Sequence, residues 1–406
     1  MNYREALTWL FGTQRFGIKL GLENSRRLFA ALRAPSPNER IIHVAGTNGK
    51  GSVCAMIDAI CRAQGYRTGL FTSPHLISFR ERIRVEGAMI PEADVARGLT
   101  MIRELIGAWD PHPTFFEITT ALALDYFRRR AVELIVLETG LGGRLDATNV
   151  PPSAVSVLTP IDYDHQKWLG QSLTEIAAEK AGIIKARIAV VSAPQPDEAA
   201  AVIVRRAAEF EAPLTFVREP LADLPIALPG AYQTQNAALA VAALQAGSIR
   251  VDEDAIARGL ATVDWPGRFQ RWDERTIIDG AHNPAAARIL AHTWQEIFGK
   301  ERATIILAVL ADKDVAGICA GLAPIVRRIL LPQIRSERAL SPNDLAPIVR
   351  GQFPDGPVSI LPSFGAAWEE ACREAVPILI TGSLHFVGEA LAALGGEPTA
   401  FEECLQ

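Results

Sequence analysis

A glycine-rich stretch, HVAGTNGKGS, occupies residues 43–52. The residues before its first glycine, Arg40–Ala45, are typical of a short buried strand, and apolar residues at positions 53, 56, 57 and 60 recur at helical spacing after it. A glycine turn between a strand and a helix directs several backbone N–H groups at one point, where the helix N-terminus adds partial positive charge. Because Lys50 can close over a bound anion, the stretch predicts a phosphate-binding loop.

This loop differs from the standard P-loop. The usual pattern G-x-x-x-x-G-K-[ST] requires glycine at position 44 and a hydroxyl residue directly after the lysine. Here position 44 is valine, and Gly51 separates Lys50 from Ser52. A turn that binds nothing is the alternative, but turn chemistry alone does not explain so many glycine, lysine and hydroxyl residues together. We therefore expect a nucleotide to be held by Gly46, Thr47, Asn48, Gly49, Lys50, Gly51 and Ser52.

Composition narrows the class of protein. A chain of 406 residues is too long for one ordinary core, which favours two domains. A hydrophobic content of 49% and a charged content of 21% are typical of a soluble globular protein. The net charge of −5 argues against general nucleic-acid binding, and no apolar run approaches the roughly 18 residues of a membrane span. Five scattered cysteines without a C-x-x-C pair indicate a reducing compartment, so a cytoplasmic location is expected. A monomer is also expected.

Alternating strands and helices predict two α/β units. In the first, strands are expected at 40–45, 66–71, 81–87, 133–138 and 154–159, with helices at 2–33 (a pair), from 91, and at 115–130, 173–182, 236–246 and 253–261. A further strand, helix and strand fall between 182 and about 217. In the second, strands are expected near 276–279, 303–309, 328–332, 357–361 and 377–381. The segment Trp265–Gln270 interrupts the alternation, so we place the domains at 1–266 and 267–406. The predicted fold is a P-loop ATPase-like domain with a mainly parallel sheet, followed by a smaller Rossmann-like domain.

Several polar segments directly follow predicted strands of the first unit. They are the glycine loop, Thr72–His75, Glu138 with the glycines behind it, and Asp164-His165. Ligands of open parallel sheets bind at the carboxyl ends of the strands, so we expect these segments to converge on one edge of one sheet.

The convergence favours a magnesium nucleotide. Magnesium prefers carboxylate, hydroxyl, water and phosphate oxygens, which makes Glu138 and the hydroxyl of Ser73 natural ligands. His165 is a less usual magnesium ligand, and imidazole alone would suggest a transition metal. Taken singly, Glu138 could be a surface carboxylate and His165 a hydrogen-bonding residue. Their shared position beside the glycine loop favours ligation.

The second unit carries a polar segment, DGAHNP, at 279–284, after its first strand. Asp279 could bond a ribose hydroxyl or a ring substituent, and His282 could reach a phosphate. The alternative is a turn before a helix, with Asn283 as its cap and Pro284 in its first position, and both interpretations can hold. Arg268, near the boundary, could clamp a phosphate from the other domain.

Together these segments resemble the folylpolyglutamate synthase/dihydrofolate synthase family of the Mur ligase superfamily. The likeness rests on six motifs in order over nearly the whole chain: 43–52, 72–75, 138–149, 164–165, 179–183 and 279–284. It implies ATP-dependent ligation, in which a pteroate or folate carboxylate becomes an acyl phosphate and the amine of L-glutamate then attacks it. It also implies ATP and two magnesium ions as cofactors, with no nucleic-acid or membrane partner.

The resemblance assigns roles to particular residues. The phosphates would lie on Thr47, Gly49, Lys50, Gly51 and Ser52, and the metal ions on Ser73, Glu138 and His165. Lys180 matches a lysine that is carbamylated in the family and helps to bind the second metal, whereas without the resemblance it would be a solvated helix lysine. The nucleotide would also contact Asn236, Arg268, Asp279 and His282. Asp146 falls where bifunctional relatives bind the pterin, with Arg144 and Phe116 as further substrate contacts, and the catalytic group would comprise Lys50, His165, Lys180 and His282.

Two questions stay open at this level. The Gly-Gly-Arg-Leu-Asp-Ala-Thr-Asn spelling at 142–149 looks like that of bifunctional bacterial enzymes, but an enzyme restricted to tail extension is the alternative. Among other classes, a cell-wall Mur ligase would need a larger domain before the loop. A P-loop ATPase switch would need neither Asp279 nor His282, and a binding module without catalysis would not need Lys50, Glu138 and His165.

Overall fold

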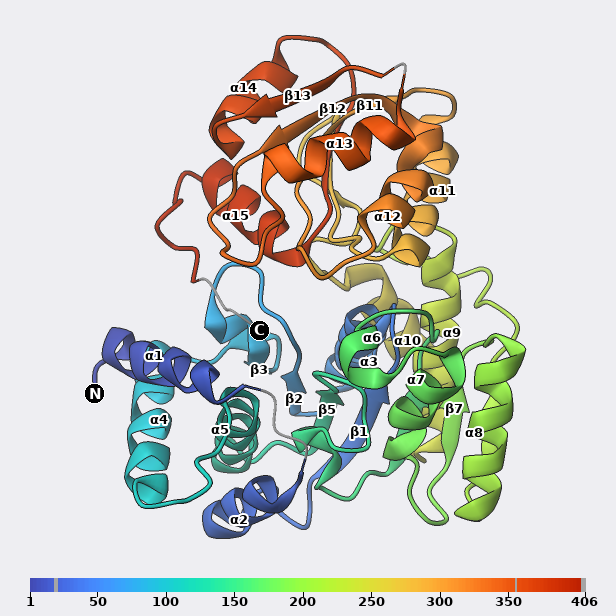
Figure 1. Ribbon diagram of the computed structural model, residues 1–406. Coiled ribbons are helices and arrows are strands. Elements are labelled where there is room, and N and C mark those ends of the chain that lie inside the picture. Colours follow the sequence, from blue (N-terminus) through green and yellow to red (C-terminus); the bar gives the residue numbers. More distant parts are fainter. Residues whose placement is uncertain (18–20, 355, 403–406) are drawn as a thin grey trace.

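Two mainly parallel β-sheets, one in each half of the chain, organise the fold (Figure 1). The computed structural model describes residues 1–17, 21–354 and 356–402. Within these residues the first sheet has the order β4-β3-β2-β5-β1-β6-β7-β8 and the second the order β13-β12-β11-β14-β10-β9. The pairs β2–β3, β3–β4 and β9–β10 are antiparallel and the other pairs are parallel. This confirms the predicted α/β class with two units.

The elements of the first half follow the predicted order. Its strands are β1 Arg40–Ala45, β2 Thr68–Phe71, β3 Ile83–Val85, β4 Ala88–Met89, β5 Leu134–Glu138, β6 Val155–Leu158, β7 Val190–Ser192 and β8 Leu214–Phe216. Its α-helices are α1 Tyr3–Gly12, α2 Glu23–Leu32, α3 Lys50–Gln64, α4 Glu92–Ile106, α5 Phe115–Arg129, α6 Gln166–Leu169, α7 Leu173–Lys180, α8 Asp197–Glu209, α9 Tyr232–Ala246 and α10 Glu253–Thr262. Short 3₁₀ turns are η1 Thr13–Phe16, η2 Phe79–Arg82, η3 Ala147–Asn149 and η4 Ala181–Ile183.

The second half repeats the alternation with a new sheet. Its strands are β9 Gln270–Arg271, β10 Thr276–Ile278, β11 Ala303–Leu307, β12 Val326–Pro332, β13 Val358–Leu361 and β14 Ile378–Thr381. Its helices are α11 Pro284–Phe298, α12 Val315–Leu322, η5 Ala323–Ile325, α13 Pro342–Gln352, α14 Phe364–Cys372 and α15 Leu384–Leu394. All five strands predicted here are present, and among the described residues of this half the short edge strand β9 is the one strand that the sequence analysis missed.

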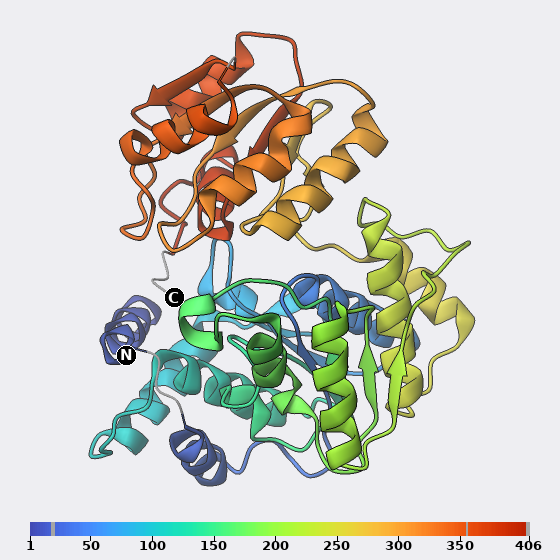
Figure 2. The same cartoon turned by 45° about the vertical axis from the view of Figure 1, so that its right-hand side comes forward.

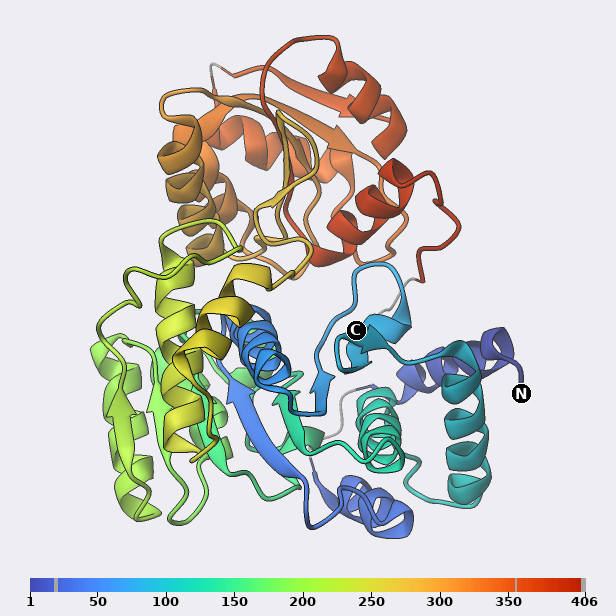
Figure 3. The ribbon, with the colours of Figure 1, turned by 180° about the vertical axis from the view of Figure 1, so that it is seen from behind.

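The central strands of each sheet are buried on both faces, as parallel strands require. Successive side chains of a strand point to opposite faces. On one face of β1, Ile41 belongs to the core formed with α1, α2, α4 and α5, and Ala45 belongs to the core formed with α7 and α8. On the other face, Ile42 and Val44 belong to the core formed with α3, α9 and α10. Figure 3 shows α3, α9 and α10 in front of the first sheet. The second sheet lies between α11, α12 and α13 on one face and α14 and α15 on the other.

One loop of the first half projects out of its sheet into the second half. Residues 72–82, in light blue, rise from β2 toward α15 in all three ribbon views (Figures 1, 2 and 3). Leu76 at its tip is 9% exposed and belongs to the hydrophobic core of α15, with Val387 and Ile278 as neighbours in that core. The domain boundary at 266/267 is still a prediction, and this loop crosses it.

The predicted strand at 81–87 is wrong in its first part. Glu81 and Arg82 end the 3₁₀ turn η2, because Ser78 and Glu81 form a capping box that satisfies the backbone there. Only Ile83–Val85 is extended. Glu86 and Gly87 then adopt positive φ, at 51° and 81°, and return the chain as the short hairpin strand β4. Helix α9 also begins earlier than predicted, at Tyr232 rather than Asn236.

Among the described residues, no helix combines the length and the apolar character needed to cross a bilayer.

Candidate functional site

The predicted segments meet at one edge of the first sheet. Strands β2, β5, β1 and β6 are consecutive neighbours, and all four run parallel. Their carboxyl ends lead into residue 72, residue 139, residue 46 and residue 159 respectively. The convergence expected from the sequence is therefore confirmed.

The glycine loop owes its shape to close backbone contacts. Gly46 has φ of +149°, and a Cβ there would lie 1.9 Å from Thr159 Oγ1. Gly49 has φ of +88°, and a Cβ there would lie 2.8 Å from Asn236 Oδ1. The N–H groups of Thr47 and Asn48 both donate to the carbonyl of Pro160, at 2.9 and 3.2 Å. No side chain of the described residues caps α3, so its first N–H groups are available to an anion.

Side chains of the loop and of α9 lie together. Lys50 Nζ folds back to donate to the carbonyl of Thr47 at 3.2 Å. The hydroxyl of Ser52 accepts from Gln233 Nε2 at 3.4 Å, and Asn236 Nδ2 donates to Gln233 Oε1 at 2.8 Å. Helix α9 thus brings Asn236 to the glycine loop, and the contact with the nucleotide that the resemblance implies stays a prediction.

Glu138 and Ser73 are joined across neighbouring strands. Glu138 is 4% exposed, and its Oε2 accepts from the backbone N–H of Ser73 at 3.0 Å. Burial raises the pKa of Glu138, and the nearby Lys50 ammonium is the largest opposing influence. The described residues contain no group of three His, Cys, Asp or Glu side chains that could hold a metal unaided. A magnesium nucleotide does not need one, since phosphate oxygens complete the shell, and the carboxylate and hydroxyl present fit that chemistry.

His165 lies at the start of the short helix α6 in a left-handed conformation, with φ of 51°. Its backbone N–H donates to Asp164 Oδ1 at 2.8 Å, and its Nε2 lies 3.8 Å from Asp164 Oδ2. Burial lowers the pKa of His165 to about 3, although Asp164 opposes this. The imidazole is therefore neutral at physiological pH, which is the form that coordinates a metal.

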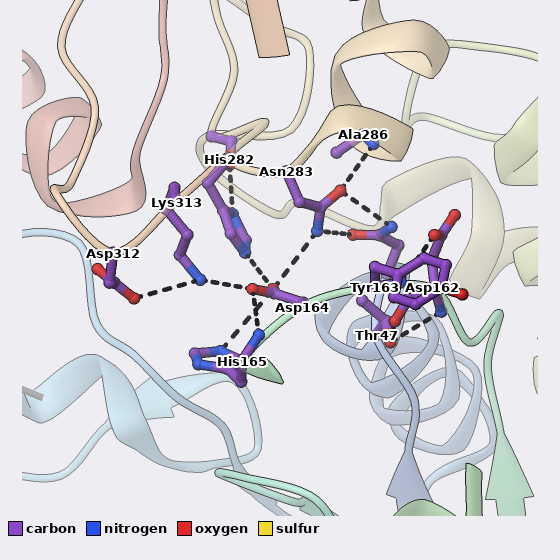
Figure 4. A network of polar contacts seen from close by, with 12 residues as sticks. Thr47, Asp162, Tyr163, Asp164, His165, His282, Asn283, Ala286, Asp312 and Lys313 are labelled. Carbon is purple, nitrogen blue, oxygen red and sulfur yellow. Dashed lines mark hydrogen bonds and ion pairs between the residues drawn. The ribbon is translucent and has the colours of Figure 1, made fainter. Parts of the chain in front are cut away.

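The DGAHNP segment forms the expected turn and helix cap, and its contacts with ribose and phosphate stay predictions. Asn283 Oδ1 accepts from Ala286 N at 2.9 Å and caps α11, and Pro284 occupies the first helical position. Asn283 Nδ2 also donates to Asn48 Oδ1 of the glycine loop at 3.0 Å, and His282 Nε2 lies 3.2 Å from Asp164 Oδ2 (Figure 4). The segment therefore faces the glycine loop directly.

Asp279 and Arg268 organise the entry into the second half. The two carboxylate oxygens of Asp279 accept from Phe269 N at 2.7 Å and Ala281 N at 2.6 Å. Burial raises the pKa of Asp279, and Arg268 opposes this. Arg268 Nη1 donates to the carbonyl of Gly267 at 3.0 Å. The structure gives Asp279 a role in shaping this turn, and its ribose contact stays a prediction.

Lys180 is buried, not solvated. It is 4% exposed at the end of α7, and its Nζ donates to the carbonyl of Gly46 at 2.8 Å. Burial, followed by the charge of Lys50, lowers its pKa to about 7. The alternative of an ordinary helix lysine is therefore wrong.

The three predicted substrate contacts differ in their surroundings. Asp146 is 6% exposed, and its carboxylate accepts from the N–H groups of Gly140, Leu141 and Thr148, so it shapes its own loop. Arg144 is half exposed and binds Glu179 Oε1 at 2.8 Å. Phe116 packs 5.8 Å from Phe71, between ring centroids. Substrate contact stays a prediction for all three.

Comparison with known proteins decides the family. The chain is 34% identical to the dihydrofolate synthase/folylpolyglutamate synthase of Bacillus subtilis, over 95% of this chain and 98% of that protein. It belongs to the folylpolyglutamate synthase/dihydrofolate synthase family. Residues 267–384 also match the family described as Mur ligase, glutamate ligase domain.

Solved structures of the synthase family are similar to this chain over nearly its whole length. The Escherichia coli enzyme in complex with DHPP and ADP is 32% identical, with a TM-score of 0.87, covering 98% of each chain. The bifunctional folylpolyglutamate synthase/dihydrofolate synthase of Yersinia pestis, complexed with AMPPNP and a Mn ion, is also 32% identical with a TM-score of 0.87, covering 97% of this chain and 98% of that one.

The sequence analysis missed one charged residue at this candidate site. Lys313 is 7% exposed, and its Nζ lies 2.6 Å from Asp164 Oδ1 (Figure 4). It follows β11, so the rule that collected the other segments at strand ends would have found it if applied to the second sheet.

Proposed function

We propose that this member of the family is an ATP-dependent ligase that joins L-glutamate to a pteroate or folate carboxylate through an acyl phosphate. The observation that carries the proposal is one assembly. The glycine loop, Glu138 and His165 lie at one sheet edge. From the loop between β10 and α11, Asn283 Nδ2 reaches Asn48 Oδ1 at 3.0 Å and His282 Nε2 reaches Asp164 Oδ2 at 3.2 Å. The ADP, AMPPNP, DHPP and Mn ion of the solved relatives, and the glutamate ligase description of the second half, support the same reaction.

The chemistry explains why two domains are used. A carboxylate is a poor acceptor for an amine, because oxide would have to leave, whereas an acyl phosphate releases phosphate. The acyl phosphate is also open to attack by water, so the site must exclude water while it forms. Alignment of the amine with the acyl carbon can lower the barrier by about 7–11 kcal/mol. The second domain provides both effects when it covers the glycine loop.

The residues divide this work. The N–H groups at the start of α3 and the Lys50 ammonium hold the phosphates, and Arg268 and His282 approach from the second domain. Ser73, Glu138 and neutral His165 would hold magnesium, which supplies neutralisation of the phosphate charge. Asn236 and Asp279 would contact the nucleoside, with Arg144, Asp146 and Phe116 at the pteroate or folate.

Lys180 would complete a second metal site as a carbamate. Its amine is buried with a pKa of about 7, so a neutral fraction is present at physiological pH. In the modification the neutral amine nitrogen bonds to the carbon of carbon dioxide and releases one proton, which gives an anionic carbamate. Counted from the ammonium form, two protons leave in all. That anion suits a second magnesium ion.

We propose that the enzyme is bifunctional. The GGRLDATN loop at 142–149 and the bifunctional names of relatives at 34% identity support this. Separate assays with dihydropteroate and with tetrahydrofolate should both give glutamate-dependent product. Activity with tetrahydrofolate alone would restrict the enzyme to tail extension.

The decisive test is phosphate release from ATP. Release should require both glutamate and the pteroate or folate, and ¹⁸O from the substrate carboxylate should appear in the phosphate. ATP turnover that ignores either substrate would overturn the ligase, and unlabelled phosphate would overturn the acyl phosphate.

The carbamate has its own test. Lys180→Ala should lose activity together with magnesium binding, measured by calorimetry, whereas Lys167→Ala, a nearby lysine outside the site, should keep both. If Lys180→Ala turns over substrate at the wild-type rate, the carbamate is ruled out and Lys180 has only a structural role.

We also propose that the enzyme works as a cytoplasmic monomer. Cys54, Cys61 and Cys319 are free and buried in the structure, which suits a reducing compartment. Size-exclusion chromatography with light scattering should give a mass near 44.0 kDa.

A further inference from the structure

One carboxylate of the first domain receives side chains from several places in the second. Asp164 is 6% exposed at its side chain. Its Oδ1 lies 2.6 Å from Lys313 Nζ, and its Oδ2 lies 3.2 Å from His282 Nε2 and 3.5 Å from Asn283 Nδ2. Figure 4 shows these three side chains pointing at Asp164 from the loops after β10 and β11.

Lys313 depends on this carboxylate for its charge balance. Its side chain is 7% exposed, so its ammonium is largely removed from water. The other carboxylate near it, Asp312, is 3.9 Å away and 45% exposed, which makes it a weak partner. Removing one member of a buried pair leaves an unpaired buried charge, which is strongly unfavourable. The pair Asp164–Lys313 therefore favours the docked arrangement of the two domains.

The same carboxylate is tied to the reacting region on both sides. Its Oδ1 accepts the backbone N–H of His165, which holds that residue in its left-handed conformation. Its Oδ2 fixes one nitrogen of His282, and His282 Nδ1 lies 3.2 Å from the carbonyl of Gly280. Asp164 thus orients both His165 and His282, although it was assigned neither to the metal site nor to the nucleotide site.

We infer that Asp164 is a positioning residue. Together with Lys313 it holds the second domain in place over the glycine loop and so keeps water from the acyl phosphate. The inference deepens the proposed function and rests on it. When the pair is absent, the domains separate more readily and water reaches the intermediate. The water oxygen then bonds to the acyl carbon, the bond from that carbon to the phosphate oxygen breaks, and free carboxylate, inorganic phosphate and a proton result.

The first test compares phosphate release with glutamate incorporation in Asp164→Asn, Lys313→Met, the double variant and Asp312→Asn. The wild type should release one phosphate per glutamate joined. Asp164→Asn and Lys313→Met should each raise this ratio at least threefold and lower kcat at least tenfold, with the KM for ATP within threefold of wild type. The double variant should resemble the single ones, because both remove one interaction. Asp312→Asn should behave as wild type.

A second test needs no substrate. Small-angle X-ray scattering of the full chain should give a larger radius of gyration for Asp164→Asn and Lys313→Met than for the wild type and Asp312→Asn, with far-ultraviolet circular dichroism unchanged.

The outcomes separate the two proposals. If phosphate release by the wild type does not depend on the folate, the proposed function is overturned. The scattering experiment then still tests whether Asp164 and Lys313 hold the two domains together. The role of Asp164 is overturned if the wild type couples the two products but the variants also release only one phosphate per glutamate joined. It is also overturned if the effects of the two single substitutions multiply in the double variant.

Discussion

Gly51, the residue that makes the phosphate loop non-standard, has a structural reason. A Cβ at Gly51 would lie 2.7 Å from Trp265 Nε1 and 3.1 Å from Trp265 Cε2. The indole of the segment that joins the two domains therefore covers the first turn of α3. A P-loop with Ser directly after the lysine has no room here.

This contact predicts that the standard spelling is harmful in this chain. Gly51→Ser should weaken ATP binding at least tenfold, because either the loop or Trp265 must move. Trp265→Leu should partly restore binding in the Gly51→Ser background, by making room. Calorimetric titration with ATP measures both, and Gly12→Ser, where nothing lies within 4 Å of a Cβ, is the control. Unchanged affinity in Gly51→Ser would show that the indole is not a constraint.

His43 is a buried titratable group beside the loop. The hydroxyl proton of Thr148 is donated to Asp146 Oδ1. In its 2.8 Å contact with His43 Nε2, the hydroxyl oxygen must therefore be the acceptor. The neutral ring therefore carries its proton on Nε2, and Nδ1 has no hydrogen-bond partner among the described residues. Burial, followed by the charge of Lys185, lowers the pKa of His43 well below 6.5.

His43 should make the protein less stable in acid. Near pH 6.5 the imidazole takes up a proton in the unfolded chain but not in the folded chain. The contribution of neutral His43 to the free energy of unfolding is therefore fully present above pH 6.5 and is lost as the pH falls below that value. One proton corresponds to about 1.4 kcal/mol per pH unit at most. His43→Gln should flatten the slope of the urea unfolding free energy below pH 6.5. The control replaces the exposed His292, and an unchanged slope in His43→Gln would contradict the assignment.

At the scale of elements, the projecting loop at 72–82 is held by the far end of the chain. Glu402 Oε2 accepts from Phe79 N at 2.6 Å, Ser78 Oγ at 3.1 Å and Tyr3 Oη at 3.0 Å. The carbonyl of Glu402 lies 2.6 Å from His75 Nε2. The loop that carries Ser73 is thus braced by residues far from it in sequence.

Removing the Glu402 carboxylate should loosen this loop. Glu402→Ala leaves the N–H of Phe79 unpaired and should cost about 1–3 kcal/mol of unfolding free energy. Hydrogen exchange at the Phe79 amide should become faster at the same time. Tyr3→Phe removes one donor and spares the rest, so it should have the smaller effect. Equal exchange rates in Glu402→Ala and wild type would argue against the brace.

Local patterns predicted most elements for a physical reason. Buried strands such as Leu134–Glu138 are short continuous apolar runs, and amphipathic helices such as Glu92–Ile106 repeat their apolar residues at helical spacing. The segment at 81–87 failed because the capping box of Ser78 and Glu81 bends the backbone there, although the residues alternate as in a strand.

For the whole molecule, the fit of the second domain depends on a glycine. A Cβ at Gly388 of α15 would lie 1.9 Å from the carbonyl oxygen of Leu76. Gly388→Ala must therefore separate α15 from the loop tip, and it should cost about 1–3 kcal/mol. Calorimetry should show the melting transition broaden or split as the domains uncouple. Gly351→Ala, at a position of α13 with nothing within 4 Å, should keep one sharp transition at or slightly above the wild-type temperature. A single sharp transition in Gly388→Ala would contradict this prediction.

The sequence by itself determined the order of strands and helices, the phosphate loop, and the polar residues at the strand ends. These depend on neighbours within a few residues and on the rule that parallel strands share an edge. Only the tertiary structure decided that Lys180 is buried, that Trp265 covers Gly51, and that Lys313 pairs with Asp164. Asp164 and Lys313 are 149 residues apart. Such contacts follow from how two sheets pack, which no local pattern encodes.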